Sequence, residues 1–349
     1  MIPRFGMASG GAGGVSGLRH DWTDAVKGPT GIVVVGYMLL MLATAMYMRF
    51  RGDVDPIGML LLFGPRTYLV WPWIVLLILA FMKSWRTGIV AIAGSLVTLF
   101  GVAQFEVPLL WPAHSSHRAF RIVTYNADVS SELSLRIRQD IEAWNADIIL
   151  LQGCARPLAE ELRTVPSYSV HTTGEFCMVV RGTLEGVDTM PPKQRHGRAG
   201  YDNLGNVLRY RVRIGGTSLP VYSVHLDSPR TAIWKARHLD FSQLIDNINS
   251  RGVQSSDISQ FVRRSDSAFV VAGDFNTPYG SQFLRRNWSD LSNAFSEVGT
   301  GFGTTMRAGL FRVRIDHVLV PRTLVPTEVK ILSDFPSEHQ PLIVDLAWR

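Results

Sequence analysis

Hydrophobic residues are spread unevenly along the chain, and the longest runs without a charged residue lie near the N-terminus. The first, Thr30–Met48, is long enough to cross the hydrocarbon layer of a bilayer, which takes about 20 residues of helix. Thr67–Met82 and Thr87–Phe105 follow it, also without charge. A cleaved signal peptide is the alternative for the first run, but that run starts late and others follow. The pattern predicts about three transmembrane helices within residues 30–106.

Polar segments flank these hydrophobic runs. Residues 1–29 are rich in glycine and polar residues and predict a mobile tail, because such a composition buries too little apolar area to repay its ordering. Residues 107–119 contain prolines and serines and predict a linker. Lys and Arg favour the cytoplasmic side of a membrane, but five flank the predicted spans on each side. The distribution of Lys and Arg therefore does not decide which side of the membrane the domain lies on.

Short apolar runs alternate with helix-like segments from residue 120 to the C-terminus. Runs of this kind predict buried strands, and apolar residues three or four apart predict helices. We expect strands at 120–125, 147–152, 176–181, 207–214, 221–226, 269–273, 312–320 and 343–348, helices at 133–144 and 231–248, and a polar loop at 250–267. Strands and helices that mix without strict repetition favour two sheets packed face to face, with helices outside.

Composition agrees with a membrane protein that carries a globular domain. The chain has 349 residues, of which 46% are hydrophobic and only 18% charged, so two structural units are expected. Its net charge of +6 suits a polyanionic substrate or an anionic membrane surface without requiring either.

The segment Val270–Pro278, VVAGDFNTP, contains the most informative motif. Its apolar residues predict a buried strand, and Asp274 and Asn276 share one side of the extended chain beyond it. Phosphate ester hydrolysis needs a carboxylate that takes a proton from water and an amide that donates to an anionic oxygen. An ordinary strand-to-turn junction is the alternative, since Gly, Asp and Asn favour turns on backbone grounds.

Five further motifs lie in or beside predicted strands. They are Thr-Tyr-Asn126, Leu-Leu-Gln152, Ser-Val-His225-Leu, Arg-Ile-Asp316-His317 and Ser-Glu338-His339-Gln-Pro. With Gly-Asp274-Phe-Asn276, this series resembles the endonuclease/exonuclease/phosphatase superfamily, which includes DNase I, apurinic endonucleases, neutral sphingomyelinases and inositol polyphosphate 5-phosphatases. The resemblance covers residues 120–349, and the apolar spans ahead of it resemble membrane-anchored bacterial members. It implies a four-layer α/β sandwich, DNase I-like, with the site at one rim of the two sheets.

The resemblance also implies roles for the residues of these motifs. Asp274 would orient or deprotonate the attacking water, and Asn276 would donate to the phosphoryl oxygens. His339 would contact the scissile phosphate while Asp316 fixes its tautomer, and His225 would assist the leaving group. Simpler interpretations exist as well. Asp316 and its neighbour could form a surface pair, and His225 could be a buried histidine satisfied by backbone.

The metal site implied by the resemblance departs from the family pattern at one position. Asn126 would help to hold Mg²⁺, with Mn²⁺ as an alternative, although Asn126 could simply cap a turn. The family has a Gln followed by the principal metal carboxylate, a Glu, where this chain has Gln152 followed by Gly153. Loss of a carboxylate from an Mg²⁺ site should weaken binding severely.

Three explanations of Gly153 remain open. Asp128 or Glu338 could supply the missing oxygen; Glu338 stands where the family has Asp, and its longer side chain can still reach a metal. The domain could have lost catalysis and bind phosphorylated ligands, or the sequence could carry an inactivating change.

The expected substrate is a phosphate ester, from nucleic acid, lipid or a small molecule. There is no dense basic stripe interleaved with aromatic residues, although Arg285, Arg286, Arg312 and Arg314 could bind phosphates. The spans favour a lipid bilayer as partner and a multi-pass protein of the cell membrane, with the domain on the outer face; protein partners stay unknown. The two cysteines, Cys154 and Cys177, are either buried free thiols or, if the domain is exported, a disulfide.

Overall fold

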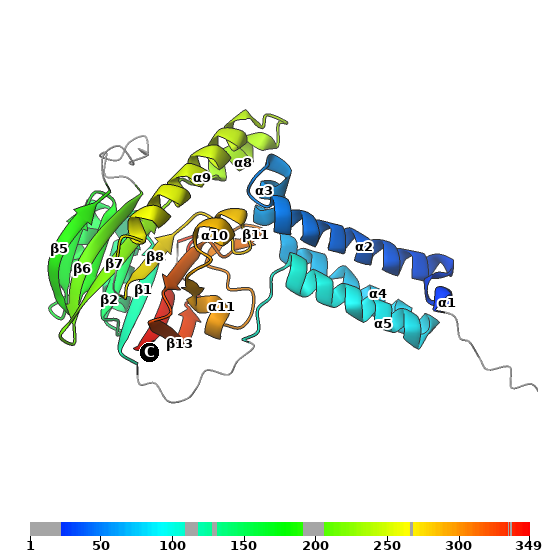
Figure 1. Ribbon diagram of the computed structural model, residues 1–349, viewed down its shortest axis with the longest axis horizontal. Helices are drawn as coiled ribbons and strands as arrows, with labels where there is room; N and C mark the ends of the chain where they lie inside the picture. Colours follow the sequence, from blue (N-terminus) through cyan, green and yellow to red (C-terminus); the bar gives the residue numbers. More distant parts are fainter. Residues whose placement is uncertain are drawn as a thin grey trace, which may run out of the picture.

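The computed structural model describes residues 22–108, 118–127, 131–190, 206–265, 268–333, 335 and 337–349. Most of the predicted tail and most of the predicted linker lie outside the described residues. Within them, a rod of helices projects from an α/β domain (Figure 1).

Three helical segments of the rod are long and apolar enough to cross a membrane. They are Gly28–Arg51, Arg66–Lys83 and Trp85–Val102, and most of each lies exposed at the surface of the chain. The first is helix α2; α1 (Thr23–Val26) precedes it, so helix begins a few residues before the predicted start of the membrane region at residue 30. The other two are built from η1 (Arg66–Val70) with α4 (Pro72–Lys83), and α5 (Trp85–Leu96) with η2 (Val97–Val102). These helices indicate association with a membrane.

The α/β domain contains two six-stranded sheets. The first has the order β13-β14-β1-β2-β4-β3, with β13 (Leu324–Ile331), β14 (Leu342–Trp348), β1 (Phe120–Asn126), β2 (Ile148–Gln152), β4 (Phe176–Val180) and β3 (Ser169–Thr173). The second has the order β5-β6-β7-β8-β12-β9, with β5 (Thr183–Thr189), β6 (Val207–Ile214), β7 (Thr217–His225), β8 (Val270–Asp274), β12 (Asp316–Val320) and β9 (Ser292–Asn293). A small hairpin, β10 (Met306–Ala308) with β11 (Phe311–Val313), stands apart from both.

The sheets pack face to face and helices cover their outer faces, which confirms the predicted four-layer sandwich. The central apolar core takes side chains from both sheets, such as Ile122 and Val270. On the first sheet's outer face lie α6 (Ser131–Asp140) and α7 (Arg156–Leu162), through residues such as Ile137. On the second lie α9 (Ser242–Val262) and α10 (Gln282–Asn287). Each layer thus buries one apolar face against the next.

Two predicted elements between β7 and β8 were wrong. The helix expected over 231–248 is divided into α8 (Arg230–Ala236) and α9, and the chain between them turns at Leu239, whose φ is +63°. The polar loop expected over 250–267 is helical as far as Val262. It forms a helix because Ile258, Phe261 and Val262 pack against the second sheet, which outweighs the low helix propensity of its serines, two of which, Ser255 and Ser259, are themselves buried.

The rod is joined to the domain by a shared apolar cluster and by polar contacts. Side chains of α2, α3 (Pro56–Phe63) and η2 pack against α8, α9 and β11. Asp53, in the turn before α3, accepts a hydrogen bond of 2.7 Å from the backbone N–H of Gln282. Glu106, just after the third span, makes a 2.7 Å ion pair with buried Arg314. The orientation of the domain relative to the spans is therefore fixed by packing.

Candidate active site

The predicted site residues come together where the central strands of the two sheets end. The backbone pairs Asp274, at the end of β8, with His225 on β7 and with Asp316 on β12. Asn126, at the end of β1, reaches the same place from the other sheet. This convergence requires Gly273, because a Cβ at that position would lie 2.0 Å from the carbonyl oxygen of Val224.

Asp274 lies at the centre of the site, where the other predicted residues surround its carboxylate. Its Oδ2 atom accepts a 2.9 Å hydrogen bond from Nδ2 of Asn126, and Nε2 of His225 and Nε2 of His339 each lie 3.7 Å away. Its Oδ1 atom accepts a 2.7 Å bond from the backbone N–H of Asn276, which closes an Asx-type turn. The turn interpretation and the functional interpretation of GDFN are therefore compatible, since the turn holds the carboxylate in place.

Asp316 and His339 form a second pair beside Asp274. Nδ1 of His339 lies 3.0 Å from Oδ2 of Asp316, so the ring turns its Nε2 atom toward Asp274. Burial raises the pKa of Asp316; the charge of His339 opposes this shift and the charge of Asp274 adds to it. Two buried carboxylates this close to each other are favoured when a cation stands nearby.

His225 is held by a residue that sequence reasoning missed. Nδ1 of His225 lies 3.1 Å from Oε2 of Glu175, and both side chains are about 94% buried. A ring that donates its Nδ1–H to Glu175 leaves Nε2 directed at Asn126 and Asp274. The alternative of a histidine satisfied by backbone does not describe these contacts.

Glu175 lies across from Gly153, where the family pattern loses its carboxylate. It stands in the turn between β3 and β4, and its carbonyl accepts from the N–H of Cys154. Cys154 and Cys177 form a disulfide that joins the end of β2 to β4. A carboxylate therefore borders the site near Gly153, but it comes from the neighbouring strand and bonds to His225.

The remaining predicted residues lie in different positions. Asp128 lies outside the described residues. Glu338 bonds through both carboxylate oxygens to Arg230 of α8, at 2.6 and 2.7 Å, and stays outside the group around Asp274. Nδ2 of Asn276 donates to the carbonyl of Leu226, at 2.8 Å, and to Asp274. Of the four arginines, Arg314 is occupied by Glu106, and Arg285 lines a separate cavity with the spans.

The residues present fit a divalent cation. Among the described residues, ligand atoms of Asp274, Asp316 and His339 lie within 4.8 Å of one another. Among the described residues, the buried Oδ1 atom of Asn126 has no hydrogen-bond partner, which is unusual for a buried amide oxygen. Carboxylate and amide oxygens are hard ligands of the kind that Mg²⁺ and Mn²⁺ take.

Glu175→Gln tests whether Glu175 positions His225. The amide keeps the size of the side chain but no longer favours the Nδ1–H tautomer, so we expect the turnover of a soluble phosphodiester to fall about 10- to 100-fold at unchanged KM. If His225 assists the leaving group, the loss will be smaller for a nitrophenolate than for an alkoxide. Glu160→Gln, at an exposed site on α7, serves as the control. Equal losses for both leaving groups would contradict this role.

His317 lies behind the site and stays neutral. Its Nε2 atom lies 2.9 Å from the carbonyl oxygen of Thr277, and its Nδ1 atom lies 3.0 Å from Nδ2 of Asn293. A neutral ring that donates from Nε2 and accepts at Nδ1 satisfies both contacts. Burial, with the nearby charge of Arg314, lowers the pKa of His317 to about 3.

The lowered pKa of His317 predicts acid sensitivity of the fold. Because the unfolded residue titrates near about 6.5, the unfolded chain binds more protons than the folded chain between that pH and about 3, and stability falls as the pH falls. From pH 7 to pH 5 the residue should account for a loss of about 2 kcal/mol. Denaturant unfolding with EDTA present should show a shallower pH dependence for His317→Gln; parallel curves would contradict the assignment.

Comparison with known proteins agrees with this geometry. The fold is that of a DNase I-like α/β sandwich. The model of the Endonuclease/Exonuclease/phosphatase family matches residues 123–339, more than half of the chain, and the chain belongs to that family. Members of the family are divalent-metal-dependent hydrolases, nucleases and phosphatases among them. No curated protein matches the sequence.

Solved structures share the fold at low sequence identity. A conserved protein of unknown function from Enterococcus faecalis has 14% identity and a TM-score of 0.51, over 66% of this chain and all of that one. A humanized D. rerio TDP2 also has 14% identity and a TM-score of 0.51, over 65% of this chain and 98% of that one. D. rerio TDP2 with a single-strand DNA product has 14% identity and a TM-score of 0.50, over 65% and 98%.

Proposed function

We propose that this chain is a membrane-anchored, Mg²⁺-dependent phosphodiesterase, with Mn²⁺ as an alternative ion. The observation that carries the proposal is the buried group of Asp274, Asp316 and His339 beside the unpartnered amide oxygen of Asn126. A bound divalent cation would neutralise charge on the phosphate, and Asn126 with the two aspartates would hold it.

The chain's own residues can supply the remaining chemistry. Asp274 accepts hydrogen bonds from two amides and is placed to orient a water and accept its proton. His339, oriented by Asp316, can donate from Nε2 to a phosphoryl oxygen. His225 donates Nδ1–H to Glu175, so a second ring proton, on Nε2, is the one that can pass to the leaving oxygen. Positioning and charge neutralisation of this kind make up most of catalysis in phosphoryl transfer.

A substrate panel tests the proposed function. The full chain in nanodiscs is assayed on DNA, sphingomyelin, phosphoinositides and a chromogenic phosphodiester, with Mg²⁺, with Mn²⁺ and with EDTA. We expect turnover of at least one substrate that EDTA abolishes and added metal restores. Turnover that survives EDTA, or none on any substrate, would count against the proposal.

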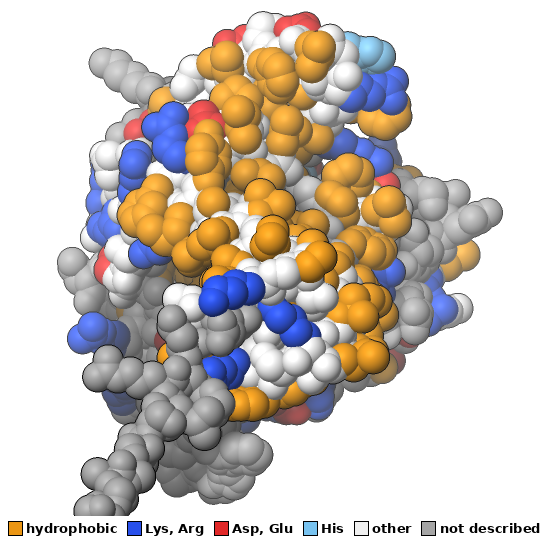
Figure 2. All heavy atoms as spheres, turned by 90° about the vertical axis from the view of Figure 1, so that its right-hand side faces the viewer, with side chains coloured by type: hydrophobic (Ala, Val, Ile, Leu, Met, Phe, Trp, Pro, Cys, Tyr) orange, Lys and Arg blue, Asp and Glu red, His pale blue; other side chains and the backbone are white. Residues whose placement is uncertain are grey.

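The residues around the site favour a membrane lipid as the phosphoester substrate. Helix α8 starts beside the site with Arg230, which bonds to Glu338, the residue before His339, and its buried side packs in the apolar cluster that contains α3. It therefore connects the site with the helix that links the first two spans (Figure 1). Trp234 is 61% exposed, and Leu239, just beyond α8, is 80% exposed. Figure 2 views the molecule from the side of the spans and shows hydrophobic side chains with Lys and Arg among them. Exposed tryptophan beside basic residues is typical of a surface at the membrane interface.

Replacing both Trp234 and Leu239 by serine tests this preference. We expect turnover of a phosphodiester lipid in vesicles to fall about tenfold, the equivalent of about 1.4 kcal/mol of lost interfacial binding, while turnover of a soluble diester stays unchanged. The control replaces Leu135 and Val187, which are exposed on other elements. An equal loss of turnover on both substrates, or no loss on the lipid, would show that Trp234 and Leu239 do not bind the membrane.

A noncatalytic domain that recognises phosphorylated ligands is the second candidate, and Gly153 favours it. Such a domain would bind a phosphodiester without turnover in the panel above.

The outer face of the cell membrane remains the proposed location of the domain. The disulfide between Cys154 and Cys177 supports this location, because disulfides persist in oxidising compartments. Labelling of both thiols without prior reduction, in protein taken directly from cells, would remove that support.

A further inference from the structure

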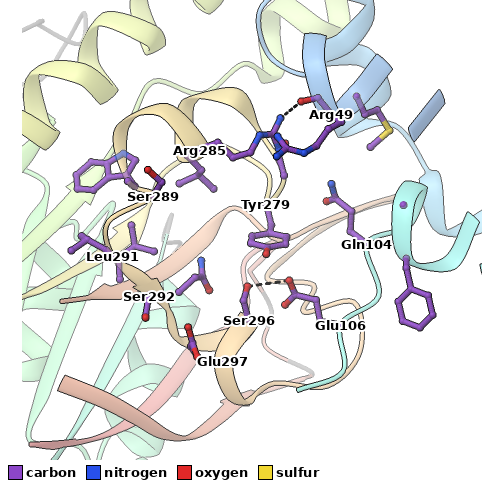
Figure 3. Close-up of a pocket in the computed structure, with 18 of the residues that line it drawn as sticks. Arg49, Gln104, Glu106, Tyr279, Arg285, Ser289, Leu291, Ser292, Ser296 and Glu297 are labelled. Atoms are coloured by element: carbon purple, nitrogen blue, oxygen red, sulfur yellow. Dashed lines mark hydrogen bonds between the residues drawn. The ribbon is translucent and has the colours of Figure 1, made fainter. Parts of the chain in front are cut away.

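A cavity of about 840 Å³ lies where the first and third spans meet the domain. It lies apart from the candidate active site: its lining includes none of Asn126, His225, Asp274, Asp316 and His339. Figure 3 shows its polar and charged side chains arranged around an open centre, with the ends of the span helices at one side. Its volume is in the range of small-molecule sites, about 300–1,000 Å³.

The two sides of the cavity differ in chemistry. The side formed by the spans is apolar and includes Ala45, Met46 and Phe100. The side formed by α10, β9 and α11 (Ala294–Val298) carries most of the polar lining, such as Ser289 and Ser292, together with apolar residues such as Trp288. The spans end at this level, so the apolar side continues the surface that would face the lipid tails, and the polar side stands at the height of the headgroups.

Two guanidinium groups meet at the boundary between these sides. Arg285 donates to the backbone carbonyls of Gly280 and Arg49, and its buried Nε atom has no partner in the described part of the chain. The Arg49 guanidinium has no hydrogen bond or ion pair among the described residues, and its charge acts on Arg285. Burial lowers the pKa of Arg285 to about 10, with the charge of Arg49 acting in the same direction, so Arg285 remains positive at neutral pH.

The acidic residues of the cavity leave these cations largely uncompensated. Glu106 is paired with Arg314 and Asp290 with Arg263, at 2.7 and 2.8 Å. Glu297 is the one remaining acidic side chain among the described residues of the lining, on the far side of the cavity from Arg49 (Figure 3). Asp53, outside the lining, also acts on Arg285, but it brings one negative charge to two guanidinium groups. Two adjacent guanidinium groups repel each other, and a phosphate between them would remove that repulsion with charge-assisted hydrogen bonds.

We propose that this cavity binds the phosphate headgroup of a membrane phospholipid, with its acyl chains lying along α2 and η2. The site is separate from the catalytic centre and does not depend on turnover. It needs only the three spans to lie in a bilayer, because their ends then place Arg49 and Arg285 at the depth of lipid phosphates.

Native mass spectrometry of the full chain in detergent tests this proposal, with phosphatidylglycerol and phosphatidylcholine added in turn. We expect one tightly retained lipid per chain, with phosphatidylglycerol preferred. Arg49→Gln should weaken its retention about tenfold, and Ser292→Phe, which fills the cavity, should abolish it. Arg286→Gln, next to Arg285 on α10 but outside the lining, serves as the matched control and should retain lipid normally.

Three results would overturn the proposal. One is lipid retention that is equal in Arg49→Gln, Ser292→Phe and Arg286→Gln while all three keep the unfolding temperature of the parent chain. Another is equal competition by soluble glycerophosphoglycerol and by the diacyl lipid, which would make the ligand a free phosphate ester. The third is absence of any retained lipid in the parent chain. Hydrolysis is not measured, so these results are independent of the proposed catalytic function.

Discussion

Asp274→Asn should lower the hydrolysis of a soluble phosphodiester by at least about 10³-fold, the largest effect expected of any single substitution in this chain. The replacement keeps the size of the side chain but removes the negative charge and the proton acceptor on which the site converges. It also places an amide N–H against the Nδ2 donor of Asn126, 2.9 Å away, so a loss of stability of about 1–3 kcal/mol is expected as well.

Two measurements separate these effects of Asp274→Asn. Single-turnover hydrolysis reports the chemical step, and thermal unfolding reports the cost to the fold. Asp290→Asn, in an exposed ion pair with Arg263, is the matched control and should change neither strongly. An Asp274→Asn protein that is folded and retains more than about a tenth of the parental rate would remove Asp274 from the proposed chemistry.

Gly153→Glu should raise the affinity for Mg²⁺ or Mn²⁺ at least tenfold, and turnover with it. Ligand count governs a site that uses only one or two carboxylates, and this change restores the one that the family pattern contains. Gly153 has a φ of +62°, so any side chain there costs about 1–2 kcal/mol of backbone strain. Glu175 stands across from it, so repulsion between the two carboxylates should make the gain depend on bound metal.

Gly153→Gln isolates the carboxylate in this experiment. It imposes the same backbone strain and nearly the same volume without the charge. Metal binding is followed by calorimetry, and hydrolysis is measured in parallel. Equal behaviour of the Glu and Gln variants would mean that position 153 does not face the metal site, and would leave the noncatalytic function as the better candidate.

The sequence was sufficient to predict the centre of the fold but not its margins. Strands such as β1, β2 and β8 are covered on both faces, so their apolar runs are continuous and easily recognised. Within the two six-stranded sheets, the strands that were missed, β3, β5, β9 and β13, are the four edges; β10 of the small hairpin was missed as well. An edge strand such as β5 alternates between exposed and half-buried residues and carries charges, which leaves little hydrophobic signal.

The same holds for the site: residues on central strands could be predicted from the sequence, and Glu175, in a turn, could not. That Asn126, His225, Asp274 and Asp316 lie close together could be predicted because each ends or begins a central strand, and strand ends meet at one edge of a sandwich. Glu175 was missed because it lies in a turn, and only the packing of one sheet on the other brings it to His225. The bond between Glu338 and Arg230, more than one hundred residues apart, likewise depends on tertiary contacts that no local pattern encodes.

The contacts between the spans and the domain had no sequence signal either. Buried Arg251 on α9 donates to the hydroxyl of Thr277, at 2.9 Å, and its other end lies 3.8 Å from the sulfur of Met59 on α3. It therefore connects the segment between the first two spans with the loop that carries Asn276. Burial lowers the pKa of Arg251 to about 10, which still leaves it charged at neutral pH.

Anomalous diffraction from crystals of the full chain soaked in Mn²⁺ tests the central claim most directly, because it locates the ion without relying on turnover. We expect one strong peak, within coordination distance of Oδ1 of Asn126 and of a carboxylate oxygen of Asp274 or Asp316. Mn²⁺ peaks confined to surface carboxylates, with none among these residues in well-ordered crystals, would contradict it.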